Sequence, residues 1–240
     1  MTPPPGTDSP PNQVVSVTLA RGIQADTLFG QGAAKPVEPT TTFINTDLPY
    51  AVIKMKTLVP DTAITLRVAD PTGESYEVNA RGPQHKNGPW QEFDFAAPLY
   101  ILGTDLEGHT GTWHLQILVS GQVQTDVAFQ WSAATPLALG RLKDVLDLTP
   151  QDSDLHWRYG AALALLGHTK EAVSELQSAI QLAHPPYALY HISLGRVFEK
   201  QGHREDAIRE FQAALALHGS FYDAVFSGWA RAHLAQLQAP

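Results

Sequence analysis

The residues of this sequence that most suggest chemistry are its ten histidines and a few closely spaced carboxylates. A metal site needs His, Asp or Glu at short fixed spacings such as HExxH, and no such motif is present. Glu74 with Glu77, and Glu92 with Asp94, fall on expected strands and turns, where neighbouring carboxylates are solvated charge more often than an acid–base pair. Gly30-Gln31-Gly32 precedes a Pro-rich stretch instead of a helix, which excludes a dinucleotide-binding loop. We therefore expect no enzyme activity, no catalytic residues, no metal and no cofactor.

The composition is that of a folded globular protein. The chain has 240 residues, of which 43% are hydrophobic and 17% charged, enough for one large or two ordinary domains. A net charge of -8 disfavours binding to nucleic acid or to an anionic membrane surface. No apolar run approaches the length of a membrane span, so we expect no membrane insertion. The absence of cysteine excludes disulfides and thiolate chemistry.

Residues 1–12 are rich in Pro, Gly and Ser, and we predict a disordered tail. Such a tail often lies between a removed export signal or lipid anchor and the first strand of an envelope protein. We favour an extracytoplasmic location, in the periplasm or cell envelope; the alternative is an ordinary cytoplasmic N-terminus.

Residues 13–133 alternate apolar and polar positions in short runs separated by turn residues, which predicts an antiparallel β domain. Val15, Val17 and Leu19 are expected on one face of the first strand. A terminal hairpin is predicted from alternating Trp113–Val119, the turn Ser120-Gly121-Gln122, and a returning strand with Phe129 and Trp131. Roughly seven to nine such strands suit two packed sheets.

Three stretches of this domain resemble the immunoglobulin-like β-sandwich modules of bacterial proteins: Thr42–Asp47, Val68–Gly73 and Gly111–Leu115. The resemblance implies a sandwich fold and no particular ligand.

Residues 134–240 change to Ala- and Leu-rich sequence with helical spacing, and they contain an internal repeat. Gly160 matches Gly195, and Ala172 matches Ala207, in both cases 35 residues apart. Residues 136–148 and 221–237 are predicted as flanking helices that complete a stack of about six. His168 and His203 share one turn position and are expected at the surface, whereas His156 and His191 are expected to pack between helices.

The repeat resembles the tetratricopeptide repeat (TPR) family, whose units pair a helix A with a helix B. The resemblance rests on two matched sets, Gly160, Gly167, Ala172, Leu176 and Ala179, then Gly195, Gly202, Ala207, Phe211 and Ala214. It implies a short TPR α-solenoid after the sandwich, hence a multidomain β plus α fold. Each unit is one residue longer than the usual TPR period.

In TPR proteins, peptides bind a concave groove lined by the A helices. Carried over to this sequence, that role falls on seven candidate partner-binding residues: Trp157, Arg158, Ile192, Ser193, Arg196, Lys200 and Arg231. Their converging cations would bind a peptide of acidic character through charge-assisted hydrogen bonds. The alternative is an ordinary solvated face, with Asp154 and Glu199 neutralising the cations.

The sequence thus predicts a non-enzymatic adaptor or scaffold that binds another protein. The alternative is a cell-envelope module whose sandwich binds a ligand or glycan, which the exposure of Tyr76, Trp90 and Tyr100 together would favour. Partner identity and oligomeric state are not readable from the sequence.

Overall fold

The computed structural model describes residues 12–25, 29–30, 34–59, 61–81, 90–217 and 222–239. The chain forms two compact units. The first comprises Met1–Thr42, Pro49–Leu99 and Thr112–Gln130, and the second comprises Phe43–Leu48, Tyr100–Gly111 and Trp131–Pro240. The boundary predicted near residue 134 coincides with the change from strand to helix. The helical unit, however, also takes in two earlier segments of the chain.

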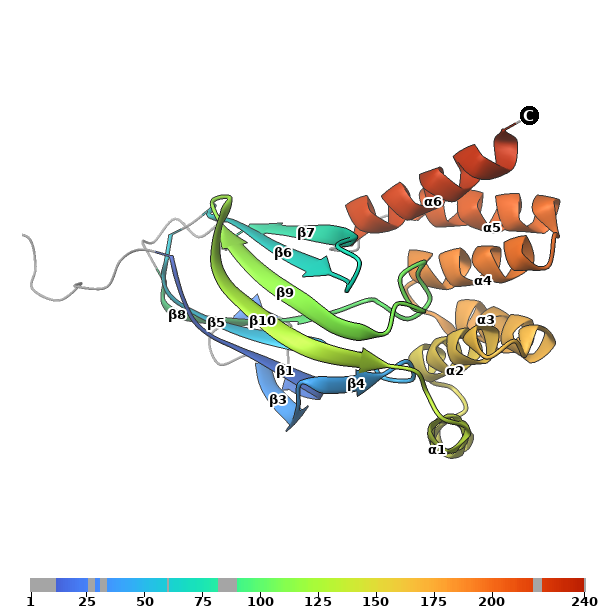
Figure 1. The fold of residues 1–240 in the computed structure, drawn as a ribbon, viewed down its shortest axis with the longest axis horizontal. Helices are drawn as coiled ribbons and strands as arrows, with labels where there is room; N and C mark the ends of the chain where they lie inside the picture. The colour runs from blue at the N-terminus through green and yellow to red at the C-terminus, as the bar shows by residue number, and fades with distance from the viewer. Residues whose placement is uncertain are drawn as a thin grey trace, which may run out of the picture. The chain divides into compact units, whose positions relative to one another are not determined.

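Two five-stranded sheets form the β region (Figure 1). One has the order β2-β8-β5-β1-β3, and the other has the order β4-β10-β9-β6-β7. Neighbours in the first sheet pair antiparallel, as do β6 with β7 and with β9. The strands are β1 (Gln13–Ala25), β2 (Phe29–Gly30), β3 (Ala34–Pro39), β4 (Thr42–Ile44), β5 (Tyr50–Leu58), β6 (Ala63–Ala69), β7 (Ser75–Arg81), β8 (Trp90–Pro98), β9 (Gly111–Val119) and β10 (Gln122–Ser132).

The predicted hairpin joins β9 to β10. Ser120 and Gly121 both have positive φ, 50° and 81°, which is the conformation of the tight turns that match the twist of a hairpin. Trp113 on β9 and Phe129 on β10 are fully buried, with ring centroids 6.2 Å apart. The alternation of apolar and polar residues therefore predicted correctly which face of this hairpin is buried.

The first strand departs from the simple alternation. The register between β1 and β5 shifts between Val14 and Ser16, as at a β-bulge, and Val15 is 48% exposed while Leu19 is buried. The expectation that Val15 shares the buried face of Leu19 was wrong. An extra residue in one strand changes the side to which the following side chains point.

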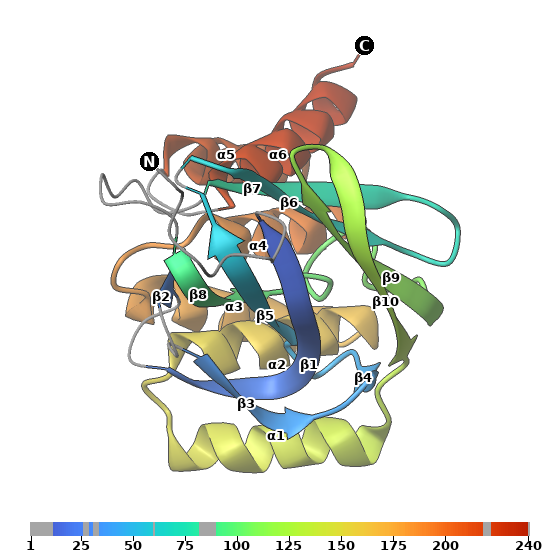
Figure 2. The ribbon, with the colours of Figure 1, turned by 90° about the vertical axis from the view of Figure 1, so that its left-hand side faces the viewer.

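Six helices make up most of the second unit, stacked from α1 to α6 (Figures 1 and 2). None of the helices in the described residues is both long and apolar enough to cross a bilayer. The helices are α1 (Pro136–Leu148), α2 (Ser153–Leu165), α3 (Thr169–Leu182), α4 (Ala188–Lys200), α5 (Arg204–Ala216) and α6 (Asp223–Gln238). The predicted β plus α architecture with six C-terminal helices is confirmed.

The repeat recurs in the geometry of two helix pairs, α2 with α3 and α4 with α5. Gly167 and Gly202 have φ of 88° and 77°, the left-handed conformation expected of glycine in these turns. The residue after each glycine donates its N–H to a carbonyl five positions back, His168 to Leu163 and His203 to Phe198, both at 2.9 Å. Each turn thus caps helix A and starts helix B in the same way.

Close helix packing explains the glycine within each helix A. A Cβ built on Gly195 would lie 2.9 Å from the ring of Phe211, which is fully buried on α5. We therefore expect Gly195→Ala to destabilise the helical unit by about 1–3 kcal/mol through overpacking, despite the better helix propensity of alanine.

The matched control is Gly228→Ala in α6, where a built Cβ meets nothing within 4 Å. This variant should gain up to about 1 kcal/mol from helix propensity alone. Denaturant unfolding of both variants checks the pair, and a gain in stability for both would contradict the packing argument.

Candidate peptide-binding face of the helical unit

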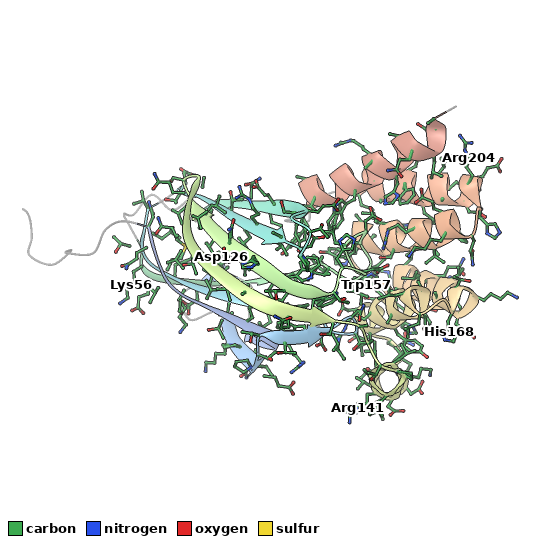
Figure 3. All side chains as sticks on the ribbon, in the orientation of Figure 1. Lys56, Asp126, Arg141, Trp157, His168 and Arg204 are labelled. Carbon is green, nitrogen blue, oxygen red and sulfur yellow. The ribbon has the colours of Figure 1, made fainter. Side chains whose placement is uncertain are left out.

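The seven predicted partner-binding residues lie on α2, α4 and α6, which we call the groove helices. Trp157, Ile192, Ser193 and Arg196 are buried, and Figure 3 shows Trp157 among the side chains of this unit. Lys200 and Arg231 are exposed, and Arg158 is half-buried. The sequence therefore placed these residues on one set of helices, and their burial divides them into an inner and an outer group.

The inner group contacts the chain itself. Tyr100–Gly111, which we call the 100–111 segment, belongs to the helical unit although it precedes all six helices in the chain. It folds through successive turns, with N–H donation from Thr104 to Ile101, Glu107 to Thr104 and His109 to Leu106 at 3.0–3.3 Å. Its apolar residues are buried with it, namely Tyr100, Ile101, Leu102 and Leu106.

An aromatic cluster holds the start of this segment. The ring of Tyr100 lies edge-on to Trp157 of α2, with centroids 6.1 Å apart, and to Tyr222 and Phe226 at 4.8 and 5.6 Å. The hydroxyl of Tyr187 donates to that of Tyr100 at 2.8 Å. Edge-on aromatic packing adds to the stabilisation from burial, so Tyr100 acts as an anchor between α2 and α6.

A hydrogen-bonded chain fixes the next turn against α2 and α4. The indole N–H of Trp157 donates to Ser193 Oγ at 3.0 Å. The Ser193 hydroxyl in turn reaches the carbonyls of Leu189 at 2.9 Å and Gly103 at 3.3 Å. Gly103 has φ of 78°, and a Cβ built there would overlap Ser193 Oγ, so the approach requires glycine.

The acidic residues of the segment meet the cations of the groove helices. Arg196 Nε donates to Asp105 Oδ1 at 2.9 Å, and its Nη2 lies 3.2 Å from Glu107 Oε1. Lys200 Nζ lies 3.6 Å from the same Glu107 oxygen. The other oxygen of Glu107 accepts the N–H of Gly103 at 2.8 Å. The side chains of Arg196 and Glu107 are only 8% and 4% exposed, so this is a buried ion network.

His233 on α6 extends the network. Its Nε2 lies 3.0 Å from Asp105 Oδ2, and its Nδ1 lies 2.7 Å from Glu199 Oε2. Burial lowers the pKa of His233, but the carboxylates of Asp105 and Glu199 outweigh it, and the net shift is upward. For Asp105, burial acts in the opposite direction and raises the pKa. Interactions with His233 and Arg196 outweigh burial and lower the pKa of Asp105 to about 2. The charged forms of both groups are therefore favoured.

Arg158 contacts Phe43–Leu48, the other early segment that belongs to the helical unit. Its Nε and Nη2 donate to the carbonyl of Thr46 at 3.1 and 2.6 Å. Thr46 lies in Phe43–Leu48, which also belongs to the helical unit. Arg158 is thus engaged with the backbone of the chain, as a guanidinium with several donors can be.

Asp154, one turn before Arg158, carries a shifted pKa. Burial raises the pKa of its carboxyl from 3.8 to about 6, with the charge of Arg158 opposing the shift. The unfolded chain releases this proton near pH 3.8, whereas the folded chain holds it until about pH 6. The folded state therefore binds more protons between these values, and its stability falls as the pH rises through them.

We expect Asp154→Asn to remove this pH dependence, because an amide cannot ionise. The variant should gain stability over the parent as the pH rises from about 4 to about 6, and should keep that gain at pH 8. Denaturant unfolding of both proteins over this pH range makes the comparison. Parallel stability curves for parent and variant would rule out the buried carboxyl as the cause.

The two histidines expected between helices form repeated side-chain pairs. His156 Nδ1 lies 2.7 Å from Glu175 Oε2, and His191 Nδ1 lies 2.8 Å from Glu210 Oε2. Both pairs join helix A to helix B at the same place in successive repeats. These histidines take part in helix pairing, and the glutamates were not identified from the sequence.

Three of the four carboxylates noted in the sequence lie opposite basic residues in the strand register. Glu77 accepts from Arg67 Nε at 2.7 Å across β6 and β7. Glu92 and Asp94 lie opposite Lys56 and Lys54 in the register of β5 and β8. Gly30 ends β2, and residues 31–33 lie outside the described part of the chain.

A small recess remains beside the 100–111 segment on the groove helices. At about 10 Å³ it has room for one water molecule, which is too little for a peptide side chain. It is lined by Gly103, Glu107, Ala161, Ala164, Ser193, Arg196, Val197 and Lys200.

The aromatic residues considered for glycan binding do not form an exposed set. Tyr76 is 6% exposed and Tyr100 8% exposed, and the side chain of Trp90 lies outside the described residues. A glycan platform needs open ring faces, so the observation that would have favoured the glycan-binding alternative is not met.

No protein-family model and no curated protein sequence matches the chain. Among solved structures it is similar to a thermophilic TPR protein of Thermus thermophilus, at 24% identity over 41% of this chain and 49% of that one, with a TM-score of 0.37. It is also similar to MamA, at 21% identity over 42% and 64% of the two chains, with a TM-score of 0.33. The chain therefore spans about half to two thirds of the length of these two structures.

A third similar structure is an immunoglobulin-like protein of Pseudomonas aeruginosa, at 12% identity over 52% of this chain and 99% of that one, with a TM-score of 0.32. Both families whose resemblance the sequence suggested are thus represented among the structural neighbours.

Proposed function

We propose that the protein is a non-enzymatic adaptor that binds another protein through its helical unit. In this proposal the β region is an immunoglobulin-like sandwich that positions the helices or adds a second contact. The helices form a short TPR solenoid, and the partner contributes a peptide segment of acidic character.

The proposal rests on one observation. The groove helices already bind an acidic segment, which belongs to the chain itself. Arg196, Lys200 and His233 surround Asp105 and Glu107 of the 100–111 segment at 2.9–3.6 Å. This is the chemistry expected of a face that recognises carboxylates in an extended or turning peptide. In this structure the acidic segment that contacts the inner group of candidate residues is part of the same chain.

An external peptide would meet the outer group. The Lys200 side chain is 52% exposed even though it approaches Glu107, and Arg231 on α6 is exposed. Lys200 and Arg231 lie on successive groove helices, α4 and α6. We infer that they bind the partner, while Trp157, Ser193 and Arg196 hold the chain's own segment in place.

The test is affinity capture from lysate of the source cell with the intact chain and with a Lys200→Glu, Arg231→Glu double variant. Circular dichroism and thermal melting first establish that the variant folds. The folding check is needed because a Glu at position 200 would lie near the buried Glu107 carboxylate. Reversal of Arg196 is avoided because it would bury an unpaired charge. We expect the variant to lose at least one partner that the parent recovers reproducibly.

A matched control carries Lys170→Glu and Arg204→Glu, two cations on α3 and α5 outside the groove helices, and should recover the same partners as the parent. Recovery of the same partners by all three proteins would overturn the assignment to Lys200 and Arg231. The envelope location stays a prediction, and localisation of the tagged protein by cell fractionation tests it separately.

A further inference from the structure

The outer side of α1 carries a concentration of exposed apolar side chains. Of the eight large hydrophobic residues that are exposed in the described part of the chain, three lie on this helix: Leu137 at 66%, Val145 at 47% and Leu148 at 82%. Only Leu142 and Leu146 of α1 are buried. The helix begins the stack (Figure 2), so α2 packs on one side of it only. Exposed apolar area of this kind on one helix indicates an interaction surface.

The residues of this face are arranged symmetrically about the middle of the helix. Leu137 and Leu148 are equally distant from the midpoint between residues 142 and 143, and so are Gly140 and Val145. Arg141 and Asp144 form the central pair, and both are exposed. Figure 3 shows Arg141 on the side of α1 away from the other helices. Helical spacing places Leu137, Arg141, Asp144 and Leu148 on one face, with Gly140 and Val145 at its two edges.

Symmetry of this kind fits a second copy of the same helix. If two α1 helices cross antiparallel about a two-fold axis at their midpoints, each Leu137 meets the other copy's Leu148. Each Arg141 then meets an Asp144, which gives two equivalent ion pairs at the centre. Gly140 and Val145 lie at the two edges of this contact, and a Cβ built on Gly140 would meet nothing within 4 Å. An isologous contact requires this self-complementarity, and a different partner would not.

The charges of α1 itself are consistent with this pairing. Lys143 is already paired with Asp147 within the helix, whereas Arg141 and Asp144 have no partner among the described residues. Antiparallel packing also places the positive end of each helix dipole beside the negative end of the other.

We propose that the protein self-associates through α1 to form a two-fold symmetric dimer, with Leu137, Arg141, Asp144 and Leu148 as its contacts. This inference is independent of the proposed peptide binding, which uses the groove helices. A single helix pair is smaller than a standard interface, so the dimer is weak and forms in the micromolar to millimolar range of concentration.

Sedimentation equilibrium of the full chain from about 1 μM to about 1 mM tests the dimer directly. We expect Leu148→Glu to weaken association by about tenfold or more, since it places a charge against Leu137 of the other copy. The matched control is Leu166→Glu, which changes an exposed leucine at the end of α2 and should leave the association unchanged. A parent chain that is monomeric at every concentration overturns the proposal, as does equal dimerisation of parent and Leu148→Glu.

Charge reversal tests the two-fold arrangement. Arg141→Asp alone opposes two aspartates at each central contact, and Asp144→Arg alone opposes two arginines, so each variant should dimerise about tenfold more weakly than the parent. An equimolar mixture of the two variants restores both opposite-charge pairs and should form a heterodimer. Failure of the mixture to associate more strongly than either variant alone overturns the antiparallel register, provided that circular dichroism shows both variants folded.

Discussion

Replacing Trp157 with alanine is expected to lower the free energy of unfolding of the helical unit by about 3–5 kcal/mol. The side chain is fully buried, and it contacts rings on both sides, edge-on to Tyr100 and stacked at 5.9 Å on Tyr190. Its removal opens a cavity where the 100–111 segment joins α2 and α4. It also takes away the donor for Ser193 Oγ. Chemical denaturation followed by far-UV circular dichroism measures the loss.

Two further variants distinguish how much stability comes from the Trp157 ring and how much from the hydrogen bond of its N–H group. Trp157→Phe keeps an aromatic side chain and should cost less than the alanine variant. Ser193→Ala removes the acceptor of the indole N–H together with the hydroxyl's bonds to the carbonyls of Leu189 and Gly103, and should cost about 1–2 kcal/mol. If Trp157→Ala instead kept nearly full stability, the residue would be free for an external ligand. A large loss places it in the folded core, which is a different role from the partner contact predicted for it.

Glu107→Ala is expected to destabilise the protein by about 3–5 kcal/mol, because it removes one member of a buried ion network and leaves the others behind. Arg196 would retain only Asp105, whose side chain is 57% exposed, and the N–H of Gly103 would lose its acceptor. Glu107→Gln should cost less, since the amide oxygen can still accept that N–H. Unfolding at low and high salt should give similar losses, because buried pairs are little screened.

The matched control is Glu77→Ala, which breaks the exposed pair with Arg67 between β6 and β7. Both side chains of that pair are at least a third exposed, so we expect a change of less than about 1 kcal/mol. A double variant, Glu107→Leu with Arg196→Met, should recover part of the loss, because it removes the buried Arg196 charge that Glu107→Ala leaves without its carboxylate partner. Comparable effects of Glu107→Ala and Glu77→Ala would show that the network is not buried in solution.

Features encoded by local patterns were predictable. The spacing of apolar residues and the stop at Pro150 placed α1 at residues 136–148, as observed. The repeated glycines placed two turns whose backbone has the expected left-handed conformation. The turn at Ser120 and Gly121 placed the last hairpin. In each case a few neighbouring residues fix the backbone, so the signal lies within one stretch of sequence.

The candidate site was only partly predictable. Its cations on the groove helices followed from the repeat register, but their resident acidic partner did not. Asp105 and Glu107 lie in a short turn-rich segment without periodicity, about 90 residues before Arg196. His233 was not selected, because its role depends on Asp105 and Glu199, which meet it only in the folded chain. Tyr100 was considered only as a candidate of the glycan-binding alternative, whereas the structure places it in the core of the helical unit.

The sequence by itself determined the two kinds of architecture, the helix repeat and the set of residues on the groove helices, because these depend on spacings of a few residues and on turn chemistry. Only the tertiary structure decided that residues 43–48 and 100–111 belong to the helical unit, that the inner candidates are buried by the chain's own segment, and that α1 keeps an exposed apolar face. Burial and ion pairing are set by residues far apart in the chain, and such contacts leave no periodic trace in the sequence.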